Sequence, residues 1–291
     1  MKGDGELSKS QRTKTFIITG IVLILLLVAI ILSGLSAERH ETIKEAMRDA
    51  VVHDINKINF FGLEVNPSLI SAYTTTAMIL VFAIILRIFF VPKFKIVPGK
   101  IQMLIETWVG LFKGLAEGNS PHRNKFVGAY IFAAGTYIFV GTMSELLGLQ
   151  AITTEGHSIS LPAPLADING AISMGVFSYL IILSGGIAGN KFKGVLLTLK
   201  EFSLPISMSF RLFGALLSGM LVTEMVYYVV ALSFVLPVVV AVLFTLIHAL
   251  VQTYVLTMLT ALFYGEVSEV HEKKPKNKKD KTKVLTEESI A

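Results

Sequence analysis

The most unusual ionisable residue of this sequence is Arg211, which lies inside a long apolar run, shortly after Pro205. An ionisable side chain within a membrane span costs about 2.5–3.5 kcal/mol on insertion scales, which makes it a candidate functional residue. Arginine stays protonated in practically every protein environment. Arg211 is therefore a fixed positive charge rather than a proton carrier.

The neighbours of Arg211 on its helical face are small. Residues three, four and seven positions apart share one face of a helix, and here they are Ser207, Gly214, Ala215 and Ser218. Small residues allow another helix to approach closely. A permanent cation on such a face suits a partner helix that carries a carboxylate and moves past it. The alternative is an arginine that only pairs with a neighbouring helix or reaches the membrane surface.

A second group of polar residues could form an ion path. His248 and Gln252 share a stripe of the last apolar run with Thr245, and Glu224 lies in the run before it. Histidine titrates near physiological pH, so His248 could pass protons together with Glu224. The alternative is a hydrogen-bonded pair that holds the two runs together.

Two further carboxylates, Glu145 and Asp167, stand at the ends of apolar runs that we expect to lie on the outer side of the membrane. They could line a water-filled entrance, or they could cap helices that face water. The sequence contains no Cys, no Gly-rich phosphate loop, no His-Glu-x-x-His and no Gly-x-Ser-x-Gly. We therefore expect no cofactor, no metal site and no nucleic-acid partner. A lipid-modifying enzyme is disfavoured because no catalytic carboxylate cluster is present.

The composition is that of a membrane protein, with 53% hydrophobic and only 16% charged residues. A run of about 20 apolar residues can span a bilayer as a helix. The sequence predicts an all-α polytopic membrane protein with about six membrane-embedded helices. These are residues 15–35, 71–91, 126–149, 171–188, 204–230 and 237–264.

The last two runs are too long for a perpendicular crossing, since about 27 residues make a helix of about 40 Å and the hydrocarbon layer is about 30 Å thick. We expect a strongly tilted antiparallel hairpin, with Leu236 and Pro237 in a tight turn. Residues 97–120 form an amphipathic pattern, with Trp108 on the apolar stripe, and predict a helix on the membrane surface.

Lys and Arg gather on one side if six spans are counted, so both termini are expected in the cytoplasm. We expect five segments, although residues 15–35 also resemble a secretory signal peptide. The segments are a cytoplasmic N-terminus (1–14), an extra span (15–35), an extracytoplasmic segment (36–65), a polytopic membrane domain (66–264) and a charged tail (265–291).

The segment Ser-Phe-Arg-Leu-Phe-Gly at 209–214, preceded by Leu-Pro-Ile-Ser at 204–207, resembles the signature of subunit a of the F-type ATP synthase. Weaker matches follow the same order along the chain. They are Val-Pro-Gly-Lys at 97–100 with Gln102 and Glu106, Ala-Asp-Ile-Asn at 166–169, and Gln252 with Tyr254 and Leu-Thr at 259–260. The resemblance covers about residues 66–264.

The resemblance implies that Arg211 faces the essential carboxylates of a rotating c-subunit ring and separates two offset ion half-channels. It implies that Ser207, Gly214, Ala215 and Ser218 face the ring. Glu145, Asp167, Glu224, His248 and Gln252 would belong to the ion pathway, with Ser207 near its inner half. Further partners would be b-type peripheral stalk subunits, the rest of the complex and membrane lipid. The chain itself would perform no ATP chemistry, would carry protons or sodium, and would reside in a bacterial plasma membrane.

The sequence departs from the usual pattern of the family at three places. Ala215 stands where the family usually has Asn, and Met220 where it frequently has Glu or His. Thr245 stands where the family has the partner of that Glu or His. Glu224 and His248 each lie about one turn further on and could preserve the pair. The alternative function is a stand-alone transporter or channel in which Arg211 binds an anionic substrate. That class predicts repeats in both halves of the chain, and we find only one half with such features.

Overall fold

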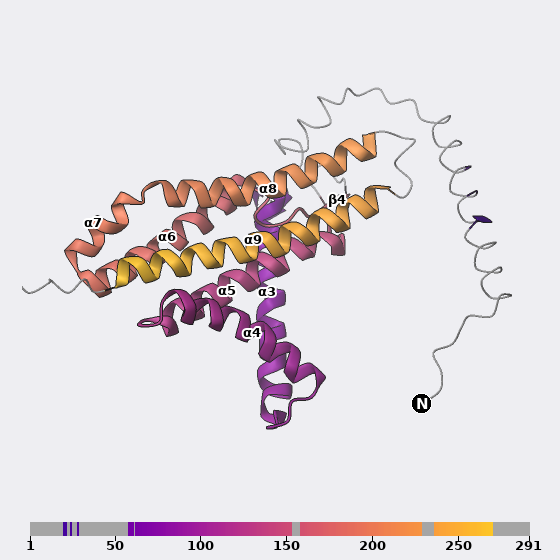
Figure 1. The fold of residues 1–291 in the computed structure, drawn as a ribbon. Coiled ribbons are helices and arrows are strands. Elements are labelled where there is room, and N and C mark those ends of the chain that lie inside the picture. Colours follow the sequence, from indigo (N-terminus) through magenta and orange to yellow (C-terminus); the bar gives the residue numbers. More distant parts are fainter. Residues whose placement is uncertain are drawn as a thin grey trace, which may run out of the picture.

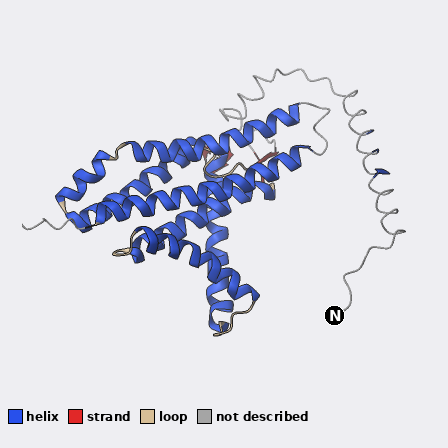
Figure 2. Ribbon diagram, in the orientation of Figure 1, coloured by secondary structure: helices blue, strands red, loops and turns tan. Residues whose placement is uncertain are grey.

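The computed structural model of the chain describes residues 20, 21, 24, 28, 58–60, 62–152, 158–228 and 236–269. Within these ranges the regular secondary structure is helical apart from two short antiparallel hairpins (Figure 2). One hairpin pairs β1 (Ile58–Phe60) with β2 (Leu63–Val65), and the other pairs β3 (Gln150–Ile152) with β4 (Ser158–Ser160). The predicted all-α membrane class is confirmed, whereas both hairpins are additions to the predicted elements.

Seven α-helices and three short helical segments make up the other elements between residues 62 and 269. The α-helices are α3 (Pro67–Ile85), α4 (Lys100–Asn119), α5 (Asn124–Met143), α6 (Ile168–Asn190), α7 (Phe192–Lys200), α8 (Ser203–Tyr228) and α9 (Leu236–Ser268). The short segments are a π-helical turn η1 (Leu86–Phe90) and the 3₁₀ turns η2 (Val91–Lys93) and η3 (Ser144–Leu147).

Five described helices are long and apolar enough to cross a membrane: Pro67–Lys93, Asn124–Leu147, Ile168–Asn190, Ser203–Thr223 and Val238–Ser268. They correspond to five of the predicted spans. The remaining prediction, 15–35, falls outside the described residues except for four helical positions, and the tail from 270 onward lies wholly outside them.

Helices α5, α6, α8 and α9 lie along one another, and α4 packs on α5 and α9 (Figure 1). Figure 1 also shows α3 crossing this bundle at a steep angle. Helix α3 and the α8–α9 pair therefore cannot both follow the membrane normal. Helix α9 has 33 residues, or about 50 Å of axial rise, so the predicted tilt of this pair agrees with its length.

The expected tight turn at Leu236-Pro237 is wrong. Both residues belong to the first turn of α9, where proline is well tolerated because its missing N–H has no partner within the helix. The connection between α8 and α9 falls in residues 229–235, outside the described part. The two helices nevertheless lie side by side and run in opposite directions, as a hairpin requires (Figure 1).

Helix α4 confirms the amphipathic helix predicted over 97–120, but its apolar stripe is divided between two surroundings. Phe112 is buried against α5, whereas Leu104 and Leu111 stay exposed. Trp108 donates a hydrogen bond of 3.1 Å from Nε1 to Oγ1 of Thr136 on α5. Trp108 is therefore anchored on a neighbouring helix as well as lying on the apolar stripe.

The end of α9 is fastened to two other parts of the chain. His122, just before α5, shares a hydrogen bond of 2.8 Å with the hydroxyl of Ser268. Asn190, at the end of α6, donates from Nδ2 to the carbonyl oxygens of Val267 at 3.0 Å and Glu269 at 2.6 Å. We call these contacts of His122 and Asn190 the C-terminal clasp. It brings the ends of α6 and α9 and the α4–α5 connection together.

Candidate functional site

Arg211 lies on a face of α8 that the described chain leaves open. Ser207, Arg211, Gly214 and Ser218 are all exposed and Ala215 is half-buried, whereas Leu212 and Leu216 on the opposite side are packed in the core. We call the five residues Ser207, Arg211, Gly214, Ala215 and Ser218 the Arg211 face. The sequence placed these residues on one face, and the structure brings them together there.

The space around Gly214 shows that no other part of the described chain packs on this face at that position. A β-carbon built at Gly214 would meet no atom within 4 Å. A β-carbon at Gly175 of α6, by contrast, would lie 2.9 Å from the carbonyl oxygen of Pro205 on α8. Helices α6 and α8 are thus in backbone contact on one side of α8, and the side that carries Gly214 has room for a further helix.

Arg211 lies close to the edge at which α8 meets α9. Ser209 touches α6 at Gly175, and Gly219 touches α9 at His248, so these two residues mark the opposite edges of the buried face of α8. With 3.6 residues per turn, Arg211 comes next to the Gly219 edge on its exposed side. Arg211 is therefore nearer, around the helix, to the α9-facing edge of α8 than to its α6-facing edge.

Contacts along α9 define the directions of α5 and α6 relative to it. Phe126 of α5 packs on Tyr264, with ring centroids 6.2 Å apart, and Gly135 accepts a hydrogen bond of 3.5 Å from Thr253, so α5 is antiparallel to α9. Gly185 of α6 lies under Tyr264, and Gly189 lies next to Ser268. Helix α6 is therefore parallel to α9.

This register gathers three of the predicted pathway residues at one end of the bundle. Glu145 lies in η3, which continues α5 and contacts α9. Asp167 precedes α6 and His248 lies in the first half of α9, at about the same level as Glu145 along the bundle. Both carboxylates and the histidine ring are half-buried. Arg211 lies eight residues before Gly219, or about 12 Å along α8 from the level of His248.

Asp167 has a structural role that the structure makes explicit. It precedes the first residue of α6 and accepts a hydrogen bond of 3.4 Å from the backbone N–H of Gly170. Its other oxygen accepts a hydrogen bond of 3.2 Å from Nδ2 of Asn66, which itself caps α3 through Ser68. Asp167 thus joins the beginnings of α3 and α6.

A cavity of about 510 Å³ opens beside Asp167, between α3, α5 and α6. Polar groups on its wall come from all three helices. They include Ser68, Tyr137, Asp167, Asn169 and Ser173. A cavity that size with polar groups on its wall can hold water. It lies at the same end of the bundle as Glu145.

The last group of predicted residues lies at the α8–α9 contact. The ring of His248 is half-buried against Gly219, with its centroid 5.7 Å from that of Phe244. Thr245 and Gln252 are buried. Glu224 belongs to α8, but its side chain is outside the described part of the structure. A contact between Glu224 and His248 therefore stays a prediction.

Sequence reasoning missed Asn66, Tyr137 and Gly219. Asn66 could have been found, since Asn followed by Pro at the beginning of an apolar run is typical of a helix start. Tyr137 and Gly219 carry no comparable signal, because their roles depend on contacts with residues far away in the sequence.

Comparison with known proteins supports one family over most of the chain. The family model described as "ATP synthase A chain" matches residues 71–265. The chain is 25% identical over 189 residues to "ATP synthase subunit a" of Cereibacter sphaeroides strain ATCC 17025 / ATH 2.4.3, which covers 60% of this chain and 72% of the relative. The corresponding protein of strain ATCC 17029 / ATH 2.4.9 has the same identity and coverage.

Proposed function

Because the chain belongs to the ATP synthase A chain family, we propose that it is the stator subunit that forms two offset ion half-channels against a ring of c subunits. The chain is a multi-pass membrane protein of the ATP synthase complex and its ion-translocating membrane sector. The proposal adds the ring as the direct partner, b-type stalk subunits as further partners, and a bacterial plasma membrane with both termini in the cytoplasm.

The observation that carries the proposal is the Arg211 face. A permanent cation stands on an exposed helix surface whose neighbours are small, and the described chain does not cover it. A site for a small anionic substrate would instead enclose the arginine, whereas Arg211 is exposed and does not line the cavity beside Asp167. An open cationic face suits a large partner whose carboxylates pass in turn.

The outer half-channel is proposed to begin at the cavity beside Asp167 and to lead past Glu145 toward the α8–α9 contact. The shared level of Glu145, Asp167 and His248 supports this course. Glu224 and Gln252 are proposed to complete it, and Ser207 is proposed to stand near the inner half-channel. A proton or sodium ion would leave this path by neutralising a carboxylate of the ring.

Arg211 is proposed to separate the two half-channels. An opposite charge nearby favours the ionised form of a carboxylate, so a ring carboxylate that reaches Arg211 releases its ion. The same charge repels a cation that would cross directly between the half-channels. Each charge that passes through the membrane potential supplies about 2.3 kcal/mol per 100 mV, which drives the rotation.

The test is Arg211→Ala in the complete complex. Loss of the charge should abolish ion-driven ATP synthesis in inverted vesicles, while passive ion leak with the catalytic sector removed should persist or increase. Arg211→Lys should fail nearly as badly, because lysine can lose its proton when buried and lacks the planar fork. Both variants should assemble, since Arg211 is exposed on α8. Substantial synthesis by Arg211→Ala would refute the proposed role.

A further inference from the structure

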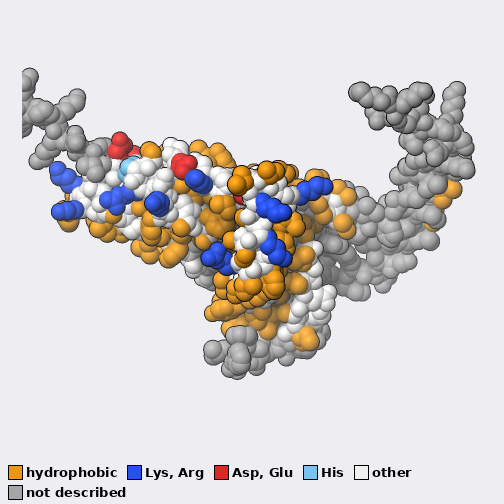
Figure 3. All heavy atoms as spheres, turned by 90° about the horizontal axis from the view of Figure 1, so that it is seen from below, with side chains coloured by type: hydrophobic (Ala, Val, Ile, Leu, Met, Phe, Trp, Pro, Cys, Tyr) orange, Lys and Arg blue, Asp and Glu red, His pale blue; other side chains and the backbone are white. Residues whose placement is uncertain are grey.

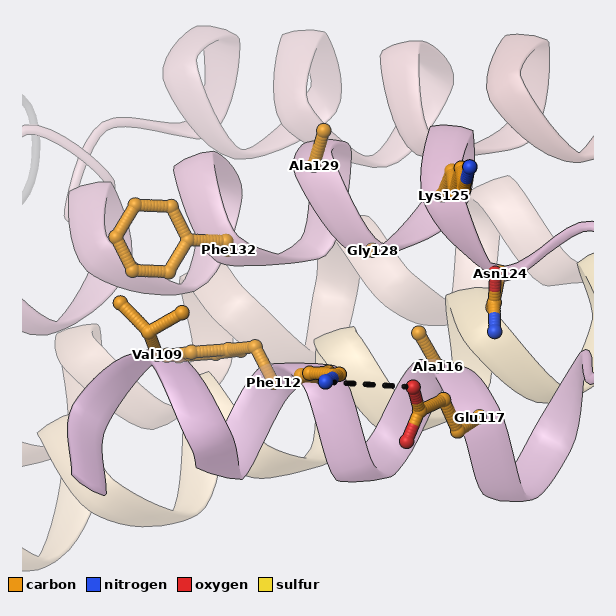
Figure 4. Close-up of a pocket in the computed structure, with 10 residues that line it drawn as sticks. Val109, Phe112, Ala116, Glu117, Asn124, Lys125, Gly128, Ala129 and Phe132 are labelled. Carbon is orange, nitrogen blue, oxygen red and sulfur yellow. Dashed lines mark ion pairs between the residues drawn. The ribbon is translucent and has the colours of Figure 1, made fainter. Parts of the chain in front are cut away.

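A groove of about 520 Å³ runs between α4 and α5 (Figure 4). Phe112 and Ala116, both buried, form its floor on α4, and Gly128 contributes from α5. The helices meet closely here, because a β-carbon at Gly128 would lie 3.3 Å from that of Ala116. The groove is of the size usual for small-molecule sites.

The groove changes in polarity from one end to the other. Figure 4 shows Asn124, Lys125 and Glu117 at one end, and Val109 and Phe132 at the other. Asn124 is the first residue of α5 and begins a candidate membrane span, so the polar end coincides with the end of that span. The apolar end extends along the span.

The charges of the groove leave one positive charge in excess. Lys113 and Glu117 of α4 form an ion pair at 3.8 Å, drawn as a dashed line in Figure 4, and both side chains are at least half exposed. Within the ranges that the structure describes, Lys125 belongs to no such pair and is exposed at the rim. Figure 3 shows one face of the molecule, on which Lys and Arg side chains lie next to extensive apolar surface.

We propose that this groove holds one anionic phospholipid, with its phosphate at Lys125 and Asn124 and an acyl chain along Val109 and Phe132. A single phosphodiester carries the one negative charge that the groove lacks. A lysine near the membrane surface attracts the negative charge of an anionic lipid headgroup and so favours lipid binding. The side-chain amide of Asn124 can donate a hydrogen bond to the phosphate. The apolar end of the groove then holds the acyl chain. A soluble phosphate compound would leave that apolar end empty.

The experiment is photolabelling of the assembled complex in phosphatidylcholine vesicles that contain a trace of phosphatidylglycerol with a diazirine on one acyl chain. Peptides of α4 and α5 that carry Val109 and Phe132 should be labelled. Lys125→Gln should lower this labelling about five-fold, which corresponds to about 1 kcal/mol for one lysine near anionic lipid. Lys125→Arg should retain it, because the charge remains.

Two further variants separate the headgroup from the acyl chain and control for assembly. Ala129 is exposed in the groove, so Ala129→Phe should fill the apolar half and prevent labelling although Lys125 is present. Lys193→Gln, at the start of α7 and outside the groove, should leave labelling unchanged. A native gel checks that each variant assembles.

Three outcomes would overturn the inference. One is equal labelling by a phosphatidylcholine probe with the same diazirine. Another is labelling that neither Lys125→Gln nor Ala129→Phe reduces. The third is a crosslink from a photoreactive residue at position 109 to another subunit, which would make the groove a protein-docking surface. Because ion-driven synthesis is not the readout, failure here is distinct from failure of the proposed role of Arg211.

Discussion

The imidazole of His248 lies against the backbone of Gly219, so that a β-carbon at position 219 would come within 3.2 Å of Nδ1 and 3.3 Å of Cε1. Helix α9 thus presents its histidine directly to α8, at the position before Met220. The sequence departs from the usual family pattern at Met220 and Thr245, and the histidine one turn further on still faces the partner helix.

Gly219→Ala should displace the ring of His248 by a few tenths of an ångström, because contacts of this length are tighter than ordinary van der Waals contact. We expect a several-fold loss of ion-driven ATP synthesis in vesicles with the complex still assembled. Gly110→Ala is the matched control, since a β-carbon there meets nothing within 4 Å. Equal activity of the two variants would remove His248 from the ion path.

Glu224→Gln tests the other half of the proposed pair. If Glu224 carries ions together with His248, the amide should lower ion-driven synthesis and change its pH profile, because glutamine cannot take up or release a proton. Assembly should be unaffected, since the substitution keeps the size of the side chain. The rate of synthesis is measured across a range of pH, and an unaltered rate and profile would leave the residue with a structural role alone.

Asp167→Asn separates capping from ion conduction. Asparagine is as good a helix cap as aspartate, so the hydrogen bond from Gly170 can persist while the charge is lost. Asparagine has one acceptor oxygen and cannot also keep the bond from Asn66, so we expect a small loss of thermal stability of the detergent-purified complex and a reduced rate of ion-driven synthesis. Full synthesis by this variant would mean that Asp167 serves only to cap α6.

Asn66→Ala is the structural counterpart of that substitution. It removes the cap of α3 and the bond to Asp167, and should lower the stability by about 1 kcal/mol. A melting temperature equal to that of the unaltered complex would show that the Asn66 contacts contribute little.

Truncation after Glu269 should leave assembly and ion flux largely intact, because the removed residues 270–291 are rich in charge and contain no apolar face to bury. Truncation after Tyr264 should be harmful, because it also removes Ser268 and the carbonyls that Asn190 contacts. Native gels and leak measurements compare the two. Loss of the complex on truncation after Glu269 would show that the tail docks on another part of the assembly.

The long apolar runs allowed the spans to be predicted, because apolar length alone determines which helices can cross a bilayer. The helix ends were predicted less well. Helix α3 begins at Pro67 rather than near 71, because Asn66 caps it and proline is favoured at the first helical position. Helix α9 continues to Ser268 because the clasp provides partners for its last turn.

The candidate site shows the same division. The Arg211 face follows from helical spacing and was predictable, since all its residues lie within twelve positions of one helix. The bond between Asn66 and Asp167 joins residues 101 positions apart, and the contact of Gly219 with His248 depends on how two helices meet. No local pattern encodes such pairs, so their presence could be learned only from the fold.

The clasp also has a mechanical meaning. If a rotating ring pulls on the Arg211 face, α9 supports α8 in the way that a beam clamped at one end supports a load. His122 and Asn190 fix the end near Ser268 to the α4–α5 connection and to α6, while side chains near the other end, such as Val238 and Val239, are exposed. Deflection under load would then grow from Ser268 toward Val238, and the contact at His248 would lie on the compliant half of the beam.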